Sequence, residues 1–222
     1  MIFLNNNDYI KNLCEKLGVY EVGFSKIDHD LPYAISIVVP LSKYIINQIG
    51  DKPTHQYFHH YRTVNTFIDN TLLKIGMEIA NQNYNYLPVA SSQSIDGYKG
   101  YLSHKTAARL AGLGFIGKNA MFISEKYGIA VRLGTILTDM PFDTGTPIQK
   151  DCGDCNLCKN ACPAMAISGV NYKEGISREE MFDPNACSEY MKKAFQHIGR
   201  GAVCGICIKN CRYFNLKNPS DS

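Results

Sequence analysis

The sequence CGDCNLCKNACP at residues 152–163 decides how the last third of this chain folds. It spaces four cysteines with two, two and three residues between them and follows the last one with a proline. Further along, CGICIKNC at residues 204–211 repeats the later part of this spacing, and Cys187 stands between the two runs. Of the nine cysteines, only Cys14 precedes residue 150. In a reducing compartment such a cluster is typical of metal binding and not of disulfides.

The spacing of the first run favours two 4Fe–4S clusters over zinc. Bacterial ferredoxins use C-x2-C-x2-C-x3-C-P, in which three close thiolates hold one cluster and the fourth cysteine crosses to the other. A zinc ribbon uses two separated pairs of cysteines instead. The crossover predicts one cluster held by Cys152, Cys155, Cys158 and Cys211, and a second held by Cys162, Cys187, Cys204 and Cys207.

Composition and charge narrow the class of protein. The chain has 222 residues, of which 45% are hydrophobic and 19% charged, and this balance excludes intrinsic disorder. The formal net charge of +3 treats every cysteine as neutral. Each bound cluster would add roughly −2, because four thiolates outweigh the charge of the iron–sulfide core. The positive formal charge is therefore a poor argument for binding nucleic acid.

No membrane segment is expected from the sequence. No stretch approaches the ~18 uninterrupted apolar residues that cross a bilayer. The first residues, MIFLNNNDYIKNL, lack the basic region and the cleavage site of a signal peptide. We therefore expect a cytoplasmic protein.

The hydrophobic pattern predicts a fold of class α+β or α/β, with two domains. A linker rich in proline, glycine and threonine at 141–150 separates a mixed α/β domain at 1–145 from a small ferredoxin-like domain with two 4Fe–4S clusters at 146–222. The expected elements of the first domain are helices over 8–18, 55–82 and 101–111, and strands within 19–27, 33–41, 83–92, 120–124 and 129–137. Cys14 lies on the apolar face of the first helix and is interpreted as a buried packing residue.

A glycine-rich stretch at 112–117 matches G-x-G-x-x-G literally. A dinucleotide-binding turn needs a strand before these glycines and a helix after them. Here a helix is expected before them and a strand after them, so this function is excluded. Gly112 is predicted to end the helix. The other glycines allow a tight loop, or a loop whose backbone approaches a large cofactor.

Taken together, these motifs resemble one family. ARLAGLGFIGKNAMFISEKYGIAVRLGTILTDMPF at 108–142, the two cysteine runs and NACSEYMKK at 185–193 occur in the same order in epoxyqueuosine reductases. The resemblance extends over residues 100–213, and related iron–sulfur arrangements occur in reductive dehalogenases. It implies a cobalamin-binding α/β domain whose base-off corrinoid receives electrons through two 4Fe–4S clusters. It also implies cofactor-binding roles for Gly112, Gly114, Gly117, Lys118, Asn119, Thr138 and Asp139.

The chain departs from the family where protons are delivered. The family has an aspartate at the position of Tyr98, and Asp96 is two residues away. Tyr98 and Asp96 are therefore the candidate catalytic residues, since a phenol or a carboxylic acid can act as a general acid. A Glu-Arg pair of the family is replaced by His104 and Lys105. The chain ends soon after its last cysteine, without the helical repeats that longer relatives use around tRNA, so a tRNA substrate is not expected.

Two functions remain open from the sequence. The first is a corrinoid-dependent reductase, an oxidoreductase that acts on an unknown small-molecule substrate. The alternative is an electron-transfer module without a substrate of its own, and a structural or regulatory iron–sulfur protein is a more distant third. Both redox functions require a low-potential electron donor of the ferredoxin or flavodoxin type as a partner.

Overall fold

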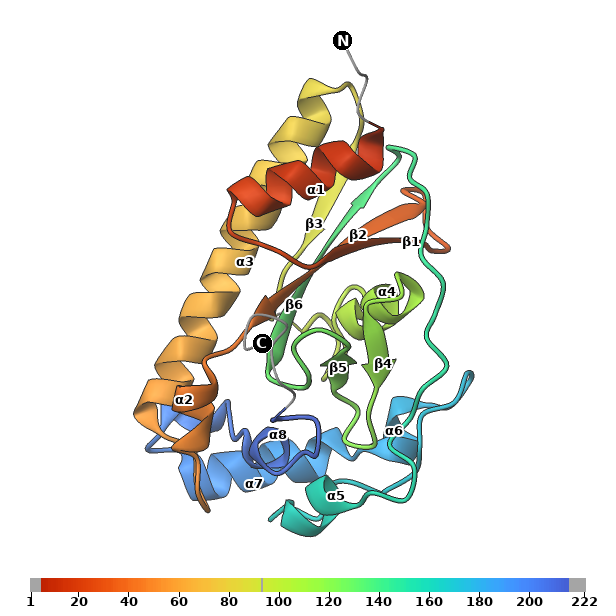
Figure 1. Ribbon diagram of the computed structural model, residues 1–222. Coiled ribbons are helices and arrows are strands. Elements are labelled where there is room, and N and C mark those ends of the chain that lie inside the picture. The colour runs from red at the N-terminus through yellow and green to blue at the C-terminus, as the bar shows by residue number, and fades with distance from the viewer. Residues whose placement is uncertain (1–4, 93, 216–222) are drawn as a thin grey trace. The chain divides into compact units, whose positions relative to one another are not determined.

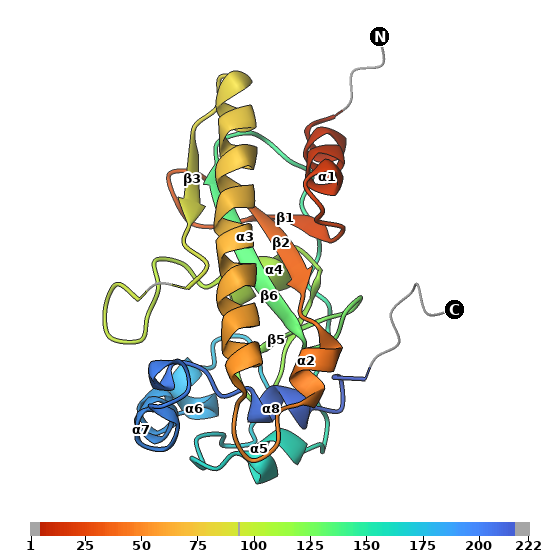
Figure 2. The ribbon, with the colours of Figure 1, turned by 90° about the vertical axis from the view of Figure 1, so that its left-hand side faces the viewer.

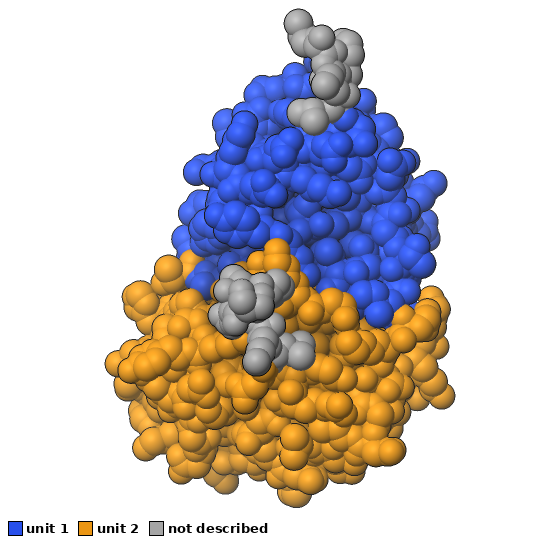
Figure 3. All heavy atoms as spheres, in the orientation of Figure 1, with its two compact units in different colours: residues 1–39, 64–114, 132–148 blue, residues 40–63, 115–131, 149–222 orange. Residues whose placement is uncertain are grey.

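The computed structural model describes residues 5–92 and 94–215, and it divides the chain into two compact units (Figure 3). Unit 1 comprises residues 1–39, 64–114 and 132–148, and unit 2 comprises 40–63, 115–131 and 149–222. The last passage between the units, at 148–149, lies close to the predicted boundary at 145–146. Two earlier stretches also belong to unit 2, and nothing in the sequence pattern indicated this. The division into domains 1–145 and 146–222 stays a prediction.

Unit 1 is built on a four-stranded sheet with the strand order β1-β2-β6-β3 (Figure 1). The strands are β1 (Val22–Lys26), β2 (Tyr33–Pro40), β3 (Tyr86–Val89) and β6 (Val131–Thr138). β1 runs antiparallel to β2 and β3 runs antiparallel to β6, with Tyr86 opposite Thr138. All four correspond to runs that the sequence pattern predicted.

The long helix α3 (His55–Asn81) covers one face of this sheet with its later turns (Figure 2). Ile68 and Leu72 of α3 are fully buried. A Cβ atom at Gly134 of β6 would lie only 2.5 Å from Ile68 Cγ2 and 3.2 Å from Leu72 Cδ1. The glycine thus allows the helix to approach the strand closely.

The opposite face of the sheet is covered by α4 (His104–Leu110). Ala107 of this helix forms a buried cluster with Ala34 of β2, Val89 of β3 and Leu137 of β6. Because successive side chains of a strand point to opposite faces, β2 and β6 are buried on both sides. This explains why both strands read as nearly continuous apolar runs in the sequence.

The first helix, α1 (Asn6–Lys16), begins at Asn5, whose side chain accepts a hydrogen bond from the Asp8 N–H at 2.8 Å. It contacts β1. Cys14 is fully buried on its apolar face, and burial raises the pKa of this thiol to about 12. The packing role expected for Cys14 agrees with this position.

The glycine-rich stretch begins where α4 ends. The Gly112 N–H donates to the Arg109 carbonyl at 3.0 Å, and the Leu113 N–H donates to the Ala108 carbonyl at 3.1 Å. These are the two bonds of a Schellman motif, in which the residue after the helix has a positive φ, and φ of Gly112 is +75°. The strand β4 (Gly114–Ile116) lies inside the motif itself. This order of elements excludes a dinucleotide-binding turn, as the sequence indicated.

Unit 2 contains a two-stranded hairpin and short helices. The hairpin pairs β4 with β5 (Phe122–Ser124), and the short helix α2 (Lys43–Asn47) comes from the earlier stretch of chain. The helices that follow residue 150 are α5 (Leu157–Ala161), α6 (Arg178–Met181), α7 (Pro184–Phe195), the 3-10 helix η1 (Gly199–Gly201) and α8 (Ile206–Lys209). The helices α5, α6 and α8 are only four or five residues long and carry no readable periodicity in the sequence.

Within residues 5–92 and 94–215, no helix combines the length and the apolar character that crossing a bilayer requires.

Candidate metal centre

The eight clustered cysteines all belong to unit 2, where they separate into two groups of four. We call Cys152, Cys155, Cys158 and Cys211 the first cysteine group. Burial, and then the neighbouring sulfurs of the other three members, raise the pKa of Cys211 to about 12. Burial likewise raises the pKa of Cys158, with the sulfurs of Cys152 and Cys155 as further causes. Thiols that perturb one another in this way lie close together.

The second cysteine group consists of Cys162, Cys187, Cys204 and Cys207. Burial, and then the sulfurs of Cys204 and Cys162, raise the pKa of Cys187 to about 11. The pKa of Cys207 is raised by burial and by the sulfurs of Cys204 and Cys187. Cys158 of the first group also acts on Cys207, so the two groups are adjacent. The neighbourhoods divide as the predicted ligand sets do, and the role of these sulfurs as cluster ligands stays a prediction.

Two packed helices explain how the last cysteine of each run reaches the other group. α5 carries Cys158 and ends at Cys162, whereas α8 carries Cys207 and is followed by Cys211. α5 and α8 contact each other. Because the chain leaves each helix at its far end, the next cysteine is carried away from the loop that precedes the helix. Cys162 thereby joins the second group and Cys211 joins the first.

The second run lacks a first cysteine, and the structure gives the reason. Gly201 stands three residues before Cys204, where a complete second run would place that cysteine. Its φ is +66°, and a Cβ atom there would lie 2.7 Å from both the Lys192 Cα and the Met191 carbonyl oxygen of α7. Backbone atoms leave no room for a side chain at this point. α7 itself supplies Cys187 from its first turns, so the helix that excludes a cysteine at 201 provides the replacement.

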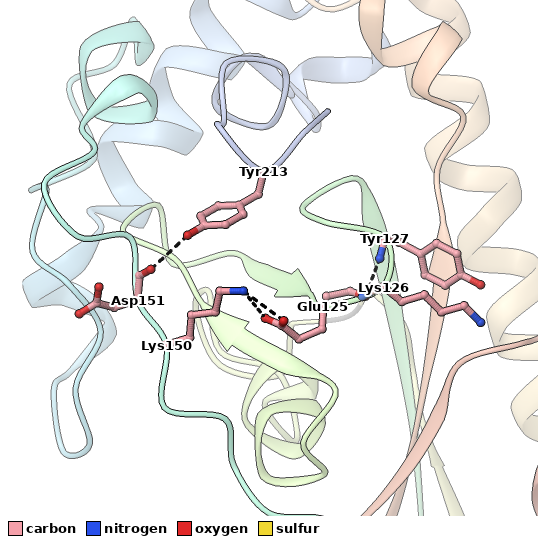
Figure 4. Close-up of polar contacts among 7 residues, drawn as sticks. Glu125, Lys126, Tyr127, Lys150, Asp151 and Tyr213 are labelled. Atoms are coloured by element: carbon pink, nitrogen blue, oxygen red, sulfur yellow. Dashed lines mark hydrogen bonds and ion pairs between the residues drawn. The ribbon is translucent and has the colours of Figure 1, made fainter. Parts of the chain in front are cut away.

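The chain segments beside Cys152 and Cys211 are joined by direct contacts (Figure 4). The Tyr213 hydroxyl donates to the Asp151 carbonyl at 3.3 Å. The Tyr213 ring also meets the Phe115 ring of β4 edge to face, with 5.3 Å between ring centroids. These contacts hold the residues just before Cys152 and just after Cys211 against the same hairpin, which brings Cys211 to the first group.

A surface ion pair lies beside the contacts of Tyr213 (Figure 4). Lys150 Nζ lies 3.0 Å from Glu125 Oε1, in a pair whose side chains are 42% and 39% exposed. The ammonium group also lies over the Phe115 ring, 5.7 Å from its centroid. An exposed pair of this kind contributes about 0–1 kcal/mol, so the buried ring contacts are the main local tie.

Four thiols in each group are the donor set that 4Fe–4S clusters use. Thiolates are soft ligands that select iron–sulfur clusters, zinc or copper(I) over harder ions. In the part of the chain that the structure describes, no three or more His, Cys, Asp or Glu side chains are placed to hold a single metal ion. The thiol chemistry of the two groups is compatible with 4Fe–4S clusters, and the eight cysteines are the residues that would hold the predicted pair.

Three residues of unit 1 that the resemblance assigns to the corrinoid are already engaged in local structure. Thr138 Oγ1 donates to the Asn85 carbonyl at 2.6 Å and accepts the Met140 N–H at 3.0 Å. Asp139 accepts hydrogen bonds from the Asn85 backbone and side chain at 2.8 and 2.7 Å, and the side-chain bond is the main cause that lowers the pKa of Asp139. Gly112 ends α4. The polar groups of Thr138 and Asp139 are thus engaged within unit 1, and a role of these three residues toward a corrinoid stays a prediction.

The remaining candidates lie at or near the turn of the β4–β5 hairpin. Gly114 begins β4, and the turn itself belongs to unit 2. The Lys118 backbone bonds to the Cys152 sulfur, and Lys118 Nζ donates to Asn156 Oδ1 at 3.3 Å. Asn119 is buried, and its side-chain nitrogen has no hydrogen-bond partner in the described part of the chain. The sequence resemblance identified this turn but did not indicate its contact with a cysteine.

The two candidate catalytic residues lie in an exposed loop before α4. The Lys99 N–H donates to the Asp96 carbonyl at 2.8 Å, which closes a turn around Gly97 and Tyr98. Gly97 has a φ of +54°, and Tyr98 is 40% exposed. Their role in proton delivery stays a prediction.

His104, which replaces a glutamate of the family, is bound at both ring nitrogens. Nε2 lies 3.0 Å from the Ala90 carbonyl and Nδ1 lies 2.9 Å from Thr135 Oγ1. A carbonyl can only accept, so Nε2 carries the proton and the neutral ring accepts the Thr135 hydroxyl proton at Nδ1. Burial lowers the pKa of His104, which favours this neutral form. His104 thus ties the loop before α4 to β6.

Unit 2 also contains a cavity. Its volume is 310 Å³, and it is lined by Pro40, Leu41, Ser42, Lys43, Tyr127 and Ala130. None of the predicted site residues lines it. Pockets for small ligands start at about this volume.

Comparison with known proteins identifies relatives of this chain. No protein-family model matches the chain. An epoxyqueuosine reductase of Synechocystis sp. is 31% identical over 195 residues, which cover 82% of this chain and 63% of that protein. An epoxyqueuosine reductase of Listeria monocytogenes is 37% identical over 92 residues, which cover 41% of this chain and 22% of that protein. The chain thus spans less than two thirds of the length of the curated relatives it matches.

Solved structures share the fold at low sequence identity. A reductive dehalogenase, whose structure suggests a mechanism for B12-dependent dehalogenation, covers 97% of this chain with a TM-score of 0.79 and 16% identity; the match covers 32% of that protein. An epoxyqueuosine reductase solved with an epoxyqueuosine-modified tRNA stem loop covers 96% of this chain with a TM-score of 0.62 and 18% identity; the match covers 67% of that protein.

The second of these structures corrects one expectation from the sequence. We expected no tRNA substrate, because the chain ends soon after its last cysteine. That expectation is wrong, since the relatives of this chain are epoxyqueuosine reductases, and one structure of such an enzyme contains an epoxyqueuosine-modified tRNA stem loop. The position of the last residue carried no information about the substrate.

The sequence relatives and the structural relatives indicate the same family. Epoxyqueuosine reductases of several bacteria match the chain at 29–44% identity in the sequence comparison. Structures of this family and of reductive dehalogenases match over nearly all of it. The chain belongs to the epoxyqueuosine reductase family.

Proposed function

We propose that this chain is an oxidoreductase, a corrinoid-dependent reductase that passes electrons through two 4Fe–4S clusters to a base-off cobalamin. The observation that carries the proposal is the division of eight thiols of unit 2 into two adjacent groups of four. When bound, the clusters supply one-electron carriers and the corrinoid supplies a strongly reducing cobalt centre. The corrinoid enters the proposal through the family and its B12-dependent structural relative.

The chain's own residues would stabilise the thiolates that hold the clusters. Burial raises the pKa of the thiols, and backbone N–H groups oppose this at several of them. The backbone N–H groups of Lys118, Ile206 and Tyr213 form hydrogen bonds with the sulfurs of Cys152, Cys204 and Cys211, respectively. Hydrogen bonds to a charged sulfur favour its charged form and are one of the means by which proteins set a cluster's potential.

The adjacency of the groups supports a relay. Cys158 of the first group and Cys207 of the second sit on the packed helices α5 and α8. A low-potential donor of the ferredoxin or flavodoxin type would supply the electrons. Asp96 and Tyr98 are the proposed proton donors, and the names of the relatives make epoxyqueuosine in a tRNA stem loop the substrate to test first.

The proposal is tested on protein purified without oxygen and reconstituted with iron and sulfide. We expect about eight irons per chain and a brown protein. Titration with cob(II)alamin, followed by electron paramagnetic resonance, is expected to give the base-off signal. Colourless protein that carries zinc would overturn the proposal. Iron-loaded protein that leaves the spectrum of free corrinoid unchanged would leave only the electron-transfer module.

Turnover is tested separately with an epoxyqueuosine-containing tRNA stem loop and a chemical low-potential reductant. We expect a product lighter by one oxygen atom in mass spectrometry. Tyr98→Phe and Asp96→Asn should slow this conversion without changing the iron content. If both variants turn over at the wild-type rate, neither residue delivers the proton.

A further inference from the structure

The turn between β4 and β5 holds its backbone in a strained form. The Ala120 N–H donates to the Gly117 carbonyl, and the Gly117 N–H donates to the Met121 carbonyl, both at 2.9 Å. Lys118 and Asn119 form the tip of this tight turn. Ala120 has a φ of +55°, which a residue with a side chain seldom adopts. The turn therefore presents the Asn119 side chain in one defined position.

Asn119 carries a buried donor without a partner. The residue is 4% exposed. Its Oδ1 accepts the Met121 N–H at 3.2 Å, and this bond fixes which end of the amide is the oxygen. Its Nδ2 is buried and has no hydrogen-bond partner within residues 5–92 and 94–215. Buried polar groups are nearly always paired, so we expect a partner from outside the polypeptide.

The surroundings of the amide indicate which partner this is. A Cβ atom built at Gly117 would lie 3.2 Å from Asn119 Oδ1 and 3.5 Å from Cys152 Sγ. Asn119 and Cys152 therefore flank the same face of Gly117. The Lys118 backbone bonds to the Cys152 sulfur from the same turn. All of these residues belong to unit 2.

We infer that Asn119 is a positioning residue of the first cluster: its Nδ2 donates a hydrogen bond to a sulfur of the cluster held by the first cysteine group. The turn at Gly117–Asn119 then contacts the first cluster and not the corrinoid. This inference rests on the proposed function, because it requires the clusters. Hydrogen bonds to cluster sulfurs stabilise the more negative, reduced state, so the bond raises the reduction potential of the first cluster.

The inference is tested by replacing the donor while keeping the shape of the side chain. Asn119→Leu removes the donor, and Asn119→Asp keeps the acceptor for the Met121 N–H but replaces the donor with a carboxylate. Asn160→Leu, at an exposed position of α5 within the first cysteine run, is the matched control. The measurements are iron content, the midpoint potentials of both clusters from redox titrations followed by electron paramagnetic resonance, and the affinity for cob(II)alamin. The signal that Cys152→Ser alters identifies the first cluster.

We expect both Asn119 variants to move the first potential to a more negative value and to leave the second potential unchanged. Asn119→Asp should give the larger shift, because it also adds negative charge, and Asn160→Leu should give none. Equal shifts of both clusters, or unchanged potentials with weaker cob(II)alamin binding, would overturn the inference. If the wild-type protein holds two clusters but the Asn119 variants have unchanged potentials, only this inference is refuted. If the wild-type protein holds no iron, the proposed function is refuted.

Discussion

The replacement of Gly201 by alanine tests the explanation for the missing cysteine of the second run. The added Cβ atom would lie 2.7 Å from the Lys192 Cα and from the Met191 carbonyl oxygen. Both are backbone atoms of a helix and cannot rotate away, so α7 must shift. Since α7 carries Cys187, the shift displaces a predicted ligand of the second cluster.

The magnitude follows from a comparison with a glycine that has room. Gly175 also has a positive φ, +82°, but no heavy atom lies within 4 Å of the place where its Cβ would be. Gly175→Ala therefore bears only the backbone strain of a left-handed residue, about 1–2 kcal/mol. Gly201→Ala bears the same strain and a clash, and overpacking of this kind costs roughly 1–3 kcal/mol more.

The assay is anaerobic urea unfolding of the reconstituted protein, together with iron determination. We expect Gly201→Ala to unfold at a lower urea concentration than Gly175→Ala and to retain less iron, by up to about one cluster. Equal midpoints and equal iron contents for the two variants would refute the reasoning. They would mean that α7 shifts at no cost in free energy, or that iron binding by Cys187 does not depend on the position of α7.

Further predictions concern single residues and the metal. Cys187→Ala should lower the iron content by about one cluster, while the spectral signal of the other cluster persists. Cys14→Ala should leave the iron content unchanged. Cys14 itself should resist alkylation in the folded protein, because burial raises its pKa to about 12. Removal of iron by a chelator should speed amide hydrogen exchange in α5 and α8 and leave β2 and β6 protected, since the sheet has its own apolar core. Burial lowers the pKa of His104 below its usual 6.5. The unfolded state then binds more protons than the folded state, so the free energy of unfolding should fall as the pH drops through 6.5. Urea unfolding at pH 7.5 and 6.0 measures this fall, and His104→Gln should make it smaller.

The elements of unit 1 were largely predictable because their signals are local. The strands β2 and β6 are apolar runs, and the helix α3 repeats buried residues at helical spacing. Phe67, an aromatic residue of the same helix, is 38% exposed. The end of α4 followed from Gly112, whereas α1 begins two residues before the predicted start and is capped by Asn5.

The assembly of unit 2 could not be predicted in the same way. Residues 40–63 and 115–131 join the cysteine-bearing segment through contacts between parts of the chain that are distant in sequence. Phe115, for example, meets Tyr213 across almost a hundred residues, and no sequence period encodes such a contact. The ligand groups could be proposed from the sequence, because the spacing of a ferredoxin run is itself a three-dimensional rule, and they stay a prediction.

The exchange of ligands between the two runs makes each half of the cysteine segment depend on the other. Cys162 follows α5 but lies with the second group, and Cys211 follows α8 but lies with the first. Helices as short as α5 and α8 are not stable alone, since forming the first turn costs more than four or five residues can return. Tertiary contacts must therefore stabilise them, the proposed clusters would add to these contacts, and neither ligand set is complete before both runs are in place. The arrangement that places the two groups next to each other, as the proposed relay needs, thus also requires the segment to fold as one piece.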